Sequence, residues 1–263
     1  MKEELTVVKI GGNVIDEEST LKEFISVFSQ LPGKKLLVHG GGKIATKIAT
    51  SLGAETRMIN GRRITDDKMI DVVVMVYGGL INKKIVSLLS KEKEKSMGLT
   101  GADGNCILAE KRPIVDGVDY GWVGDIKAVD AGFFRALLEA GIIPVLCALT
   151  HDGQGHLLNT NADTIAGEVA VALSPSYNVA LSYCFEWRGV LKDVDDPNSL
   201  IKRIDAKLYE KLKADGIVSA GMIPKLDNAF AAIKRGVAKV NILNLESFPY
   251  LNDRNYEGYT KLH

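Results

Sequence analysis

Short apolar runs alternate with glycine turns and helix-like stretches at the start of this chain. Leu5 to Ile10 is an apolar run that ends at Gly11 and Gly12, and Lys35 to His39 is a second run that ends at three more glycines. Apolar residues at helical spacing follow each turn. This repeated order predicts an α/β fold with a mainly parallel central sheet and helices on both faces, a three-layer αβα sandwich.

Local signals extend this prediction along the chain. Thr20 and Glu23 match a capping box and predict a helix start. Asn60-Gly61, between two short β-prone stretches, predicts a hairpin, because both residue types tolerate positive φ. Pro224 suits the first position of a helix. In a parallel sheet ligands bind beyond the carboxyl ends of the strands, so both glycine turns are predicted at that edge.

Composition narrows the classes of function. The 33 basic and 33 acidic residues give no net charge, so nothing indicates a nucleic-acid partner. The longest apolar runs, such as Ile142 to Leu149, are too short for a bilayer, so no membrane partner is expected. Three cysteines without a CxxC pair predict reduced thiols and a cytoplasmic protein. The four histidines show no zinc-ligand spacing, so no protein-bound metal is expected.

Two features of the first lobe suit an anionic ligand. Lys9 stands in an apolar strand next to a glycine turn, where its ammonium group would meet an anion; alone, it is as well explained by a side chain that reaches water. In His39-Gly40-Gly41-Gly42, glycines allow backbone N–H groups to approach a phosphate. The triplet lacks the Gly-Lys-Ser/Thr of a Walker A loop and the spacing of a dinucleotide fingerprint.

Two further features lie in the second half. Asn159, Asn161 and Asp163 fall within five residues, which is more than one helix cap requires. Gly221-Met222-Ile223-Pro224-Lys225 places Lys225 in a first helical turn, where a cation opposes the helix dipole. A bound anion would resolve that conflict, and so would a lysine that faces solvent.

Together these stretches resemble the amino acid kinase family, and within it the acylglutamate kinases. The matching motifs occur in the family's order over nearly the whole chain: Lys9-Ile10-Gly11-Gly12, Val38-His39-Gly40-Gly41-Gly42, Asn60-Gly61-Arg62-Arg63-Ile64-Thr65, Gly98-Leu99-Thr100-Gly101-Ala102-Asp103-Gly104, Gly121-Trp122-Val123-Gly124, Asn159-Thr160-Asn161-Ala162-Asp163 and Gly221-Met222-Ile223-Pro224-Lys225. The hairpin motif and the last motif are the most specific.

The resemblance implies the activity and the roles of the site residues. ATP, with Mg²⁺ on its phosphates, would phosphorylate the γ-carboxylate of an N-acylglutamate, acetyl or succinyl, in arginine biosynthesis. By this resemblance Lys9 and Lys225 would stabilise charge on the transferring phosphoryl group, and Asp163 would organise both lysines. The backbone N–H groups of Gly11, Gly12 and Gly41 would donate hydrogen bonds to phosphate. Gly41 and Gly42 would surround the acyl-amino acid, Arg63 would pair with its α-carboxylate, and Asn159 would bind the same substrate.

The resemblance also implies one amino acid kinase domain, in which residues 1–150 bind the acyl-amino acid and residues 151–263 bind ATP, and a homodimer. One segment departs from the family pattern: residues 183–189, Tyr-Cys-Phe-Glu-Trp-Arg-Gly, lack the aspartate that relatives place near the nucleotide. Two alternatives therefore stay open, a non-catalytic nucleotide- or amino-acid-binding regulator and a kinase for another amino acid.

Overall fold

The computed structural model describes residues 2–59, 62–193, 195–196, 198–218, 222–253 and 255–263. The chain forms two compact units. Unit 1 consists of Met1–Lys35 and Ala166–His263, and unit 2 consists of Leu36–Ile165. The first strand therefore folds with the C-terminal residues. The assignment of one substrate to residues 1–150 and the other to residues 151–263 concerns binding, and it stays a prediction.

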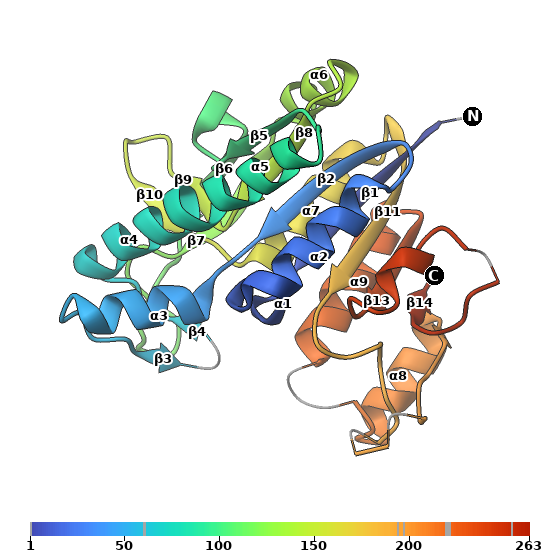
Figure 1. Cartoon of the computed structure of the whole chain (residues 1–263). Helices are drawn as coiled ribbons and strands as arrows, with labels where there is room; N and C mark the ends of the chain where they lie inside the picture. Colours follow the sequence, from blue (N-terminus) through green and yellow to red (C-terminus); the bar gives the residue numbers. More distant parts are fainter. Residues whose placement is uncertain (1, 60–61, 194, 197, 219–221, 254) are drawn as a thin grey trace. The chain divides into compact units, whose positions relative to one another are not determined.

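Unit 1 contains five strands in the order β12-β14-β13-β11-β1. β1, β11, β13 and β14 are labelled in Figure 1. β1, β11 and β13 are parallel neighbours, and β14 runs antiparallel to β13. The strands are β1 (Glu3–Ile10), β11 (Tyr177–Cys184), β12 (Arg203–Ile204), β13 (Lys239–Leu243) and β14 (Thr260–Leu262). The helices are α1 (Gly12–Asp16), α2 (Glu18–Ser29), α8 (Ala206–Ala214), α9 (Ile223–Lys234) and the 3₁₀ turn η3 (Phe248–Tyr250).

Aromatic packing fixes α2 within unit 1. Phe24 stacks on Phe28 with ring centroids 5.7 Å apart, and it meets Phe248 of η3 at 4.9 Å. All three rings are fully buried, so they hold the helix face that the apolar spacing predicts. The capping-box prediction is wrong, because α2 begins at Glu18 and both Thr20 and Glu23 lie inside it.

Unit 2 contains the parallel strands β2-β8-β5, a four-stranded sheet in the order β10-β9-β6-β7, and the hairpin β3-β4. The strands are β2 (Lys34–His39), β3 (Met58–Ile59), β4 (Arg62–Arg63), β5 (Ser96–Leu99), β6 (Ile107–Lys111), β7 (Gly124–Val129), β8 (Ile143–Cys147), β9 (Leu149–His151) and β10 (Leu157–Asn159). The helical elements are α3 (Gly42–Ser51), α4 (Asp67–Val73), η1 (Val74–Ile81), α5 (Asn82–Lys91), η2 (Asp103–Asn105) and α6 (Ala131–Glu139). α7 (Ala162–Leu173) begins in unit 2 and continues in unit 1.

The central strand of the parallel sheet in unit 2, β8, is covered by helices. All five residues of β8 are buried, and both α5 and α6 contact it. A parallel strand covered on both faces reads as a continuous apolar run, as Ile142 to Leu149 does. The prediction of an α/β fold with a mainly parallel sheet is confirmed. The predicted hairpin pairs Met58 with Arg63, and its turn, Asn60-Gly61, lies outside the described residues.

A long helix covers one side of unit 2. α4, η1 and α5 run without interruption from Asp67 to Lys91, and η1 is a π-helix. By length and composition it is the one helix in the described chain that could cross a membrane. Its inner side is core: the residues it buries include Val73, Tyr77 and Ile85, and α5 contacts β5 and β8. Core helices of soluble proteins share these properties.

A polar network is buried beneath this helix. His39 is fully buried at the end of β2, and its Nδ1 lies 2.9 Å from the Gly40 carbonyl oxygen. Asn82 Nδ2 lies 3.1 Å from His39 Nε2 and 2.9 Å from the Val145 carbonyl oxygen. The Asn82 side chain passes so close to β5 that a Cβ at Gly98 would lie 1.9 Å from its Oδ1. The network therefore joins β2, β5, β8 and α5.

Candidate functional site

The second glycine turn follows β2 and opens α3. Gly41 has φ 151° and ψ 31°, a conformation that side chains rarely adopt. A Cβ there would also lie 2.1 Å from Ile81 Cδ1 and 3.2 Å from the Tyr77 ring. Position 41 therefore requires glycine. The first N–H groups of α3, beginning at Gly42, have no partner within the helix and are suited to an anion.

Arg63 lies beside this turn, on β4. Its side chain is buried, at 8% relative exposure. Nη2 donates to the Gly42 carbonyl oxygen at 2.9 Å and to Thr46 Oγ1 at 2.8 Å, and Nη1 lies 3.4 Å from Thr56 Oγ1. These acceptors are neutral, and no carboxylate of the described residues forms an ion pair with Arg63. A buried guanidinium group in neutral surroundings favours an anionic ligand.

Tyr77 contacts the same glycine turn and Arg63, and it was not predicted from the sequence. Its ring lies against Gly41, and its hydroxyl oxygen would lie 4.0 Å from a Cβ at Gly42. Burial raises the pKa of the Tyr77 hydroxyl, and the charge of Arg63 and a hydrogen bond from it oppose that rise. The hydroxyl is therefore neutral and contacts the guanidinium group. An apolar helix gives no sequence signal that one tyrosine contacts the glycine turn and an arginine.

Asn159 is held at the same end of unit 2. Its Nδ2 donates to Thr65 Oγ1 at 3.0 Å, two residues after Arg63 on the chain. The backbone of Trp122 connects both segments, since its N–H donates to the Thr65 carbonyl and its carbonyl accepts from Asn159 N at 2.8 Å. The Asn159 side-chain oxygen has no hydrogen-bond partner in the described part of the chain, so it is available to a donor such as an amide N–H.

Asp163 stands in the first turn of α7 and is buried. The cap of this helix is Asn161, whose Oδ1 accepts from Asp163 N at 2.8 Å and from Thr164 N at 3.1 Å. The three Asx residues therefore have separate tasks, because Asn159 pairs with Thr65 and the Asp163 carboxylate is not a cap. A Cβ at Gly40 would lie 3.9 Å from Ala162 Cβ, so this turn lies beside the glycine turn.

Unit 1 holds the other glycine turn. Lys9 is half-buried next to the end of β1. Burial raises the pKa of the Cys184 thiol to about 12, and the charge of Lys9 opposes this rise. Gly11 N–H donates to the Cys184 carbonyl oxygen at 2.8 Å, so this amide already has a protein acceptor. Gly12 begins α1, where its N–H has no helical partner. The Gly12 N–H is thus better placed than the Gly11 N–H to donate a hydrogen bond to an anion.

Lys225 also lies in unit 1, in the first turn of α9 beside Pro224. Its Nζ lies 5.4 Å from the centroid of the Phe185 ring, a cation–π contact. Phe185 is buried, and its Cβ would lie 3.1 Å from a Cβ at Gly11. The unusual segment 183–189 therefore connects the first glycine turn with Lys225, while its Trp187 is 40% exposed. Gly221 lies outside the described residues.

The predicted site residues thus form two groups. Unit 2 brings together Gly41, Gly42, Arg63 and Asn159, with Asp163 at the next helix start, and unit 1 brings together Lys9, Gly11, Gly12 and Lys225. That Asp163 organises both lysines stays a prediction. No group of three or more His, Cys, Asp or Glu in the described residues could hold a metal ion. All three cysteines are free thiols, as expected.

In unit 2 a glycine turn at the end of a parallel strand lies beside a buried arginine, an arrangement typical of α/β proteins that bind small anionic ligands. The family is shown by sequence: the model of the "Amino acid kinase family" matches residues 4–244. The chain belongs to the amino acid kinase family. Kinase activity, which this family and the acetylglutamate kinases among its relatives imply, uses ATP.

Relatives agree over almost the full length. The acetylglutamate kinase of Phocaeicola vulgatus is 54% identical over 242 residues, which cover 92% of this chain and 94% of that protein. The acetylglutamate kinase of Cytophaga hutchinsonii is 50% identical over 260 residues, with 99% and 98% coverage.

A solved structure shares the fold. N-acetylglutamate synthase from Neisseria gonorrhoeae, complexed with coenzyme A and N-acetyl-glutamate, superposes with a TM-score of 0.83 at 23% identity. The match covers 98% of this chain but 59% of the synthase, so the chain spans little more than half of that protein. At this identity the likeness shows the fold alone.

Proposed function

We propose that this chain phosphorylates the γ-carboxylate of an N-acylglutamate with ATP, in arginine biosynthesis. It is a phosphotransferase with a carboxyl group as acceptor, and N-acetylglutamate is the acceptor that the acetylglutamate kinases among its relatives indicate. A carboxylate oxygen attacks the γ-phosphorus, the bond to the β,γ-bridging oxygen breaks, and an acyl phosphate and ADP result. The carboxylate is ionised at neutral pH, so the step requires no general base.

The surroundings of Arg63 carry this proposal. A buried guanidinium group with neutral acceptors costs free energy unless an anion joins it. The α-carboxylate of the acceptor is such an anion, and Arg63 presents a planar donor pair to it. The Gly42 N–H and the Asn159 side-chain oxygen lie in the same unit and suit the acylamide. Gly41 allows Ile81 and the Tyr77 ring to pack against this turn, because they occupy the space that a Cβ would take.

The phosphoryl group is assigned to the other residues. Lys9 and Lys225 would stabilise the charge that spreads over the transferring oxygens, because phosphoryl transfer depends on positioning and electrostatic stabilisation. Asp163 would orient both ammonium groups by charge-assisted hydrogen bonds. Gly11, Gly12 and Gly41 would form the phosphate cradle, in which Gly11 serves by close approach, because its N–H is engaged with Cys184.

Several finer assignments belong to the same proposal. Mg²⁺ would be held by the ATP phosphates and would offset their charge. Residues 1–150 would bind the acyl-amino acid and residues 151–263 would bind ATP. The active form would be a cytoplasmic homodimer without nucleic-acid or membrane partners. The acyl group is acetyl or succinyl, because the residues around the phosphoryl group do not discriminate between them.

A substrate panel tests the activity. Purified protein with ATP, Mg²⁺ and acetyl- or succinylglutamate should release ADP, and hydroxylamine should trap the acyl phosphate. Turnover with carbamate, glutamate or aspartate alone would identify a kinase for another amino acid. Ligand binding without turnover on any acceptor would favour the regulator, for which the unusual segment 183–189 is the supporting observation.

Variants test the assigned roles. Arg63→Gln should raise the KM for the acyl-amino acid roughly 30-fold or more, because it removes the partner of a buried charge. Arg135→Gln, an exposed arginine on α6, is the matched control and should leave KM unchanged. Lys9→Ala or Lys225→Ala should lower kcat by orders of magnitude with a smaller change in KM. A loss confined to KM would contradict the lysine roles.

A further inference from the structure

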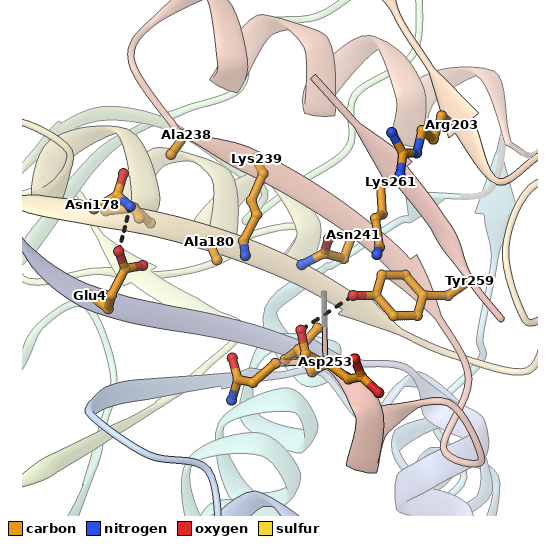
Figure 2. Close-up of a pocket in the computed structure, with 13 residues that line it drawn as sticks. Glu4, Asn178, Ala180, Arg203, Ala238, Lys239, Asn241, Asp253, Tyr259 and Lys261 are labelled. Carbon is orange, nitrogen blue, oxygen red and sulfur yellow. Dashed lines mark hydrogen bonds between the residues drawn. The ribbon is translucent and has the colours of Figure 1, made fainter. Parts of the chain in front are cut away.

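Unit 1 contains a cavity that the phosphoryl-transfer site does not use. Its volume is about 610 Å³, within the range of about 300–1,000 Å³ that small-molecule sites occupy. It lies over the first halves of β1, β11 and β13, and the loop at residues 251–253 forms its far wall (Figure 2). Glu4, in its lining, precedes Ile10 by six residues on β1, about 20 Å along an extended strand. The cavity is therefore remote from the first glycine turn.

Three cationic side chains occupy neighbouring positions on the sheet wall of this cavity. The strand registers place Arg203 opposite Lys261, and Lys261 opposite Asn241. Lys239 precedes Asn241 by two residues and so projects from the same face of β13. Like charges directly opposite in a sheet are destabilising. In Figure 2 the Lys239 and Lys261 ammonium groups point to the same side, one on each side of the Asn241 amide.

Lys261 is subject to the charges of both neighbouring cations. Desolvation lowers the pKa of its ammonium group most, and the charges of Arg203 and Lys239 lower it further, while Glu257 and Asp253 oppose the shift. Its Nζ donates to the Tyr256 carbonyl oxygen at 2.8 Å. A neutral carbonyl does not offset a charge, so the cationic group retains capacity for an anion.

The acidic groups around the cavity have other partners. Glu257 lies 2.9 Å from Lys202 Nζ and 3.6 Å from an Arg203 nitrogen. Glu4 accepts from Asn178 Nδ2 at 2.6 Å, and Asp253 accepts from the Asn255 N–H at 2.9 Å. Within the described chain neither Lys239 nor Lys261 forms an ion pair. Two of the three cations therefore face the cavity without a carboxylate of their own.

Polar groups at the base of the cavity are preorganised. Asn241 is 1% exposed, and its Nδ2 donates to Ser182 Oγ at 3.1 Å. The Tyr259 hydroxyl donates to the Leu251 carbonyl oxygen at 3.3 Å, which ties the loop to β14. The Asn241 amide is therefore held in a fixed position between the two lysines by its hydrogen bond to Ser182.

We propose that this cavity binds a small multivalent oxyanion, a phosphate or a polycarboxylate, between Lys239, Lys261 and Arg203. Each oxygen of such a ligand accepts a charge-assisted hydrogen bond, and its charge removes the repulsion along the wall. An anion that binds the folded state and not the unfolded state stabilises the fold. Within unit 1 the site is separate from the first glycine turn, so its occupancy need not follow turnover.

Thermal unfolding with inorganic phosphate or citrate as the probe tests this site. The protein is kept saturated with a non-hydrolysable ATP analogue and N-acetylglutamate, so that the probe occupies neither the catalytic phosphate position nor the Arg63 site. Free Mg²⁺ is held constant, because citrate binds it, and sodium chloride balances the ionic strength. Wild-type Tm should rise and saturate with the probe. A lower half-saturating concentration for citrate than for phosphate identifies a polycarboxylate ligand, and the reverse identifies a phosphate.

Lys239→Gln is the decisive variant, because its lysine makes no hydrogen bond within the described chain. In chloride alone its Tm should equal or exceed that of wild type, since repulsion is relieved. With the probe, half-saturation should require roughly tenfold more anion. Lys207→Gln, exposed on α8, should respond as wild type does. Equal anion responses of Lys239→Gln and wild type, or no saturable response in wild type, would overturn the proposal.

Discussion

Acidification should destabilise this protein through His39. The imidazole is fully buried, and burial lowers its pKa from 6.5 to about 4, although its hydrogen bond to the Gly40 carbonyl opposes the shift. The folded state therefore keeps the ring neutral, with Nδ1 as donor to Gly40 and Nε2 as acceptor from Asn82. Above pH 6.5 both folded and unfolded states carry a neutral ring, so this contribution to stability is complete there.

The loss begins as the pH falls through 6.5, because the unfolded chain then binds a proton that the folded chain excludes. It continues until the folded-state pKa, about 4, and is constant below it. The difference between 6.5 and 4 is 2.5 pKa units, which corresponds to a loss of about 3 kcal/mol in the free energy of unfolding.

Urea unfolding of wild type and His39→Gln, followed by circular dichroism, measures this loss. Glutamine does not titrate, and its carbonyl oxygen can still accept from Asn82. The variant is less stable at neutral pH, but the gap between the two proteins should narrow by about 3 kcal/mol between about pH 7 and pH 4. Parallel pH profiles would refute the assignment of this acid sensitivity to His39.

Three further outcomes follow from the same coordinates. Gly41→Ala should lower stability by about 2 kcal/mol or more through contact with Ile81, measured by urea midpoint, whereas Gly53→Ala shares a positive φ but meets open space and should cost less. Tyr77→Phe should raise the KM for the acyl-amino acid roughly tenfold with kcat retained, because Arg63 loses a hydrogen bond; equal changes in both would contradict this. The cysteines are buried and burial raises each pKa to about 12, so iodoacetamide should label them in urea and not in the native state.

The sequence predicts the strand, turn and helix order well because each signal is local. An apolar run such as Leu5 to Ile10 determines its own burial, and glycine turns limit the elements on either side. The start of α2 was misplaced because Thr20 and Glu23 match a capping pattern, yet the preceding residues Glu18 and Ser19 continue the helix once it packs. Tertiary packing here outweighs a local cap.

The site follows from the sequence less completely. Motif positions identify Arg63, but its neutral partners Thr46 and Thr56 come from separate segments and have no sequence signature. The π-helix η1 depends on how α4 and α5 pack, so the spacing of apolar residues does not predict it. The placement of Tyr77, which lies on η1, is not predicted for the same reason. The engagement of the Gly11 amide by Cys184 likewise depends on the register of β1 against β11.

The buried network of His39 and Asn82 restricts how this sequence can vary. Asn82 satisfies His39 and Val145 at once, and it fits only because Gly98 has no side chain. A larger residue at 98 would displace the Asn82 amide and leave His39 Nε2 without its donor. A larger residue at 98 therefore requires a smaller one at 82, and position 39 then needs a side chain that does without the Asn82 donor. A variant library of this protein should change 82 and 98 together.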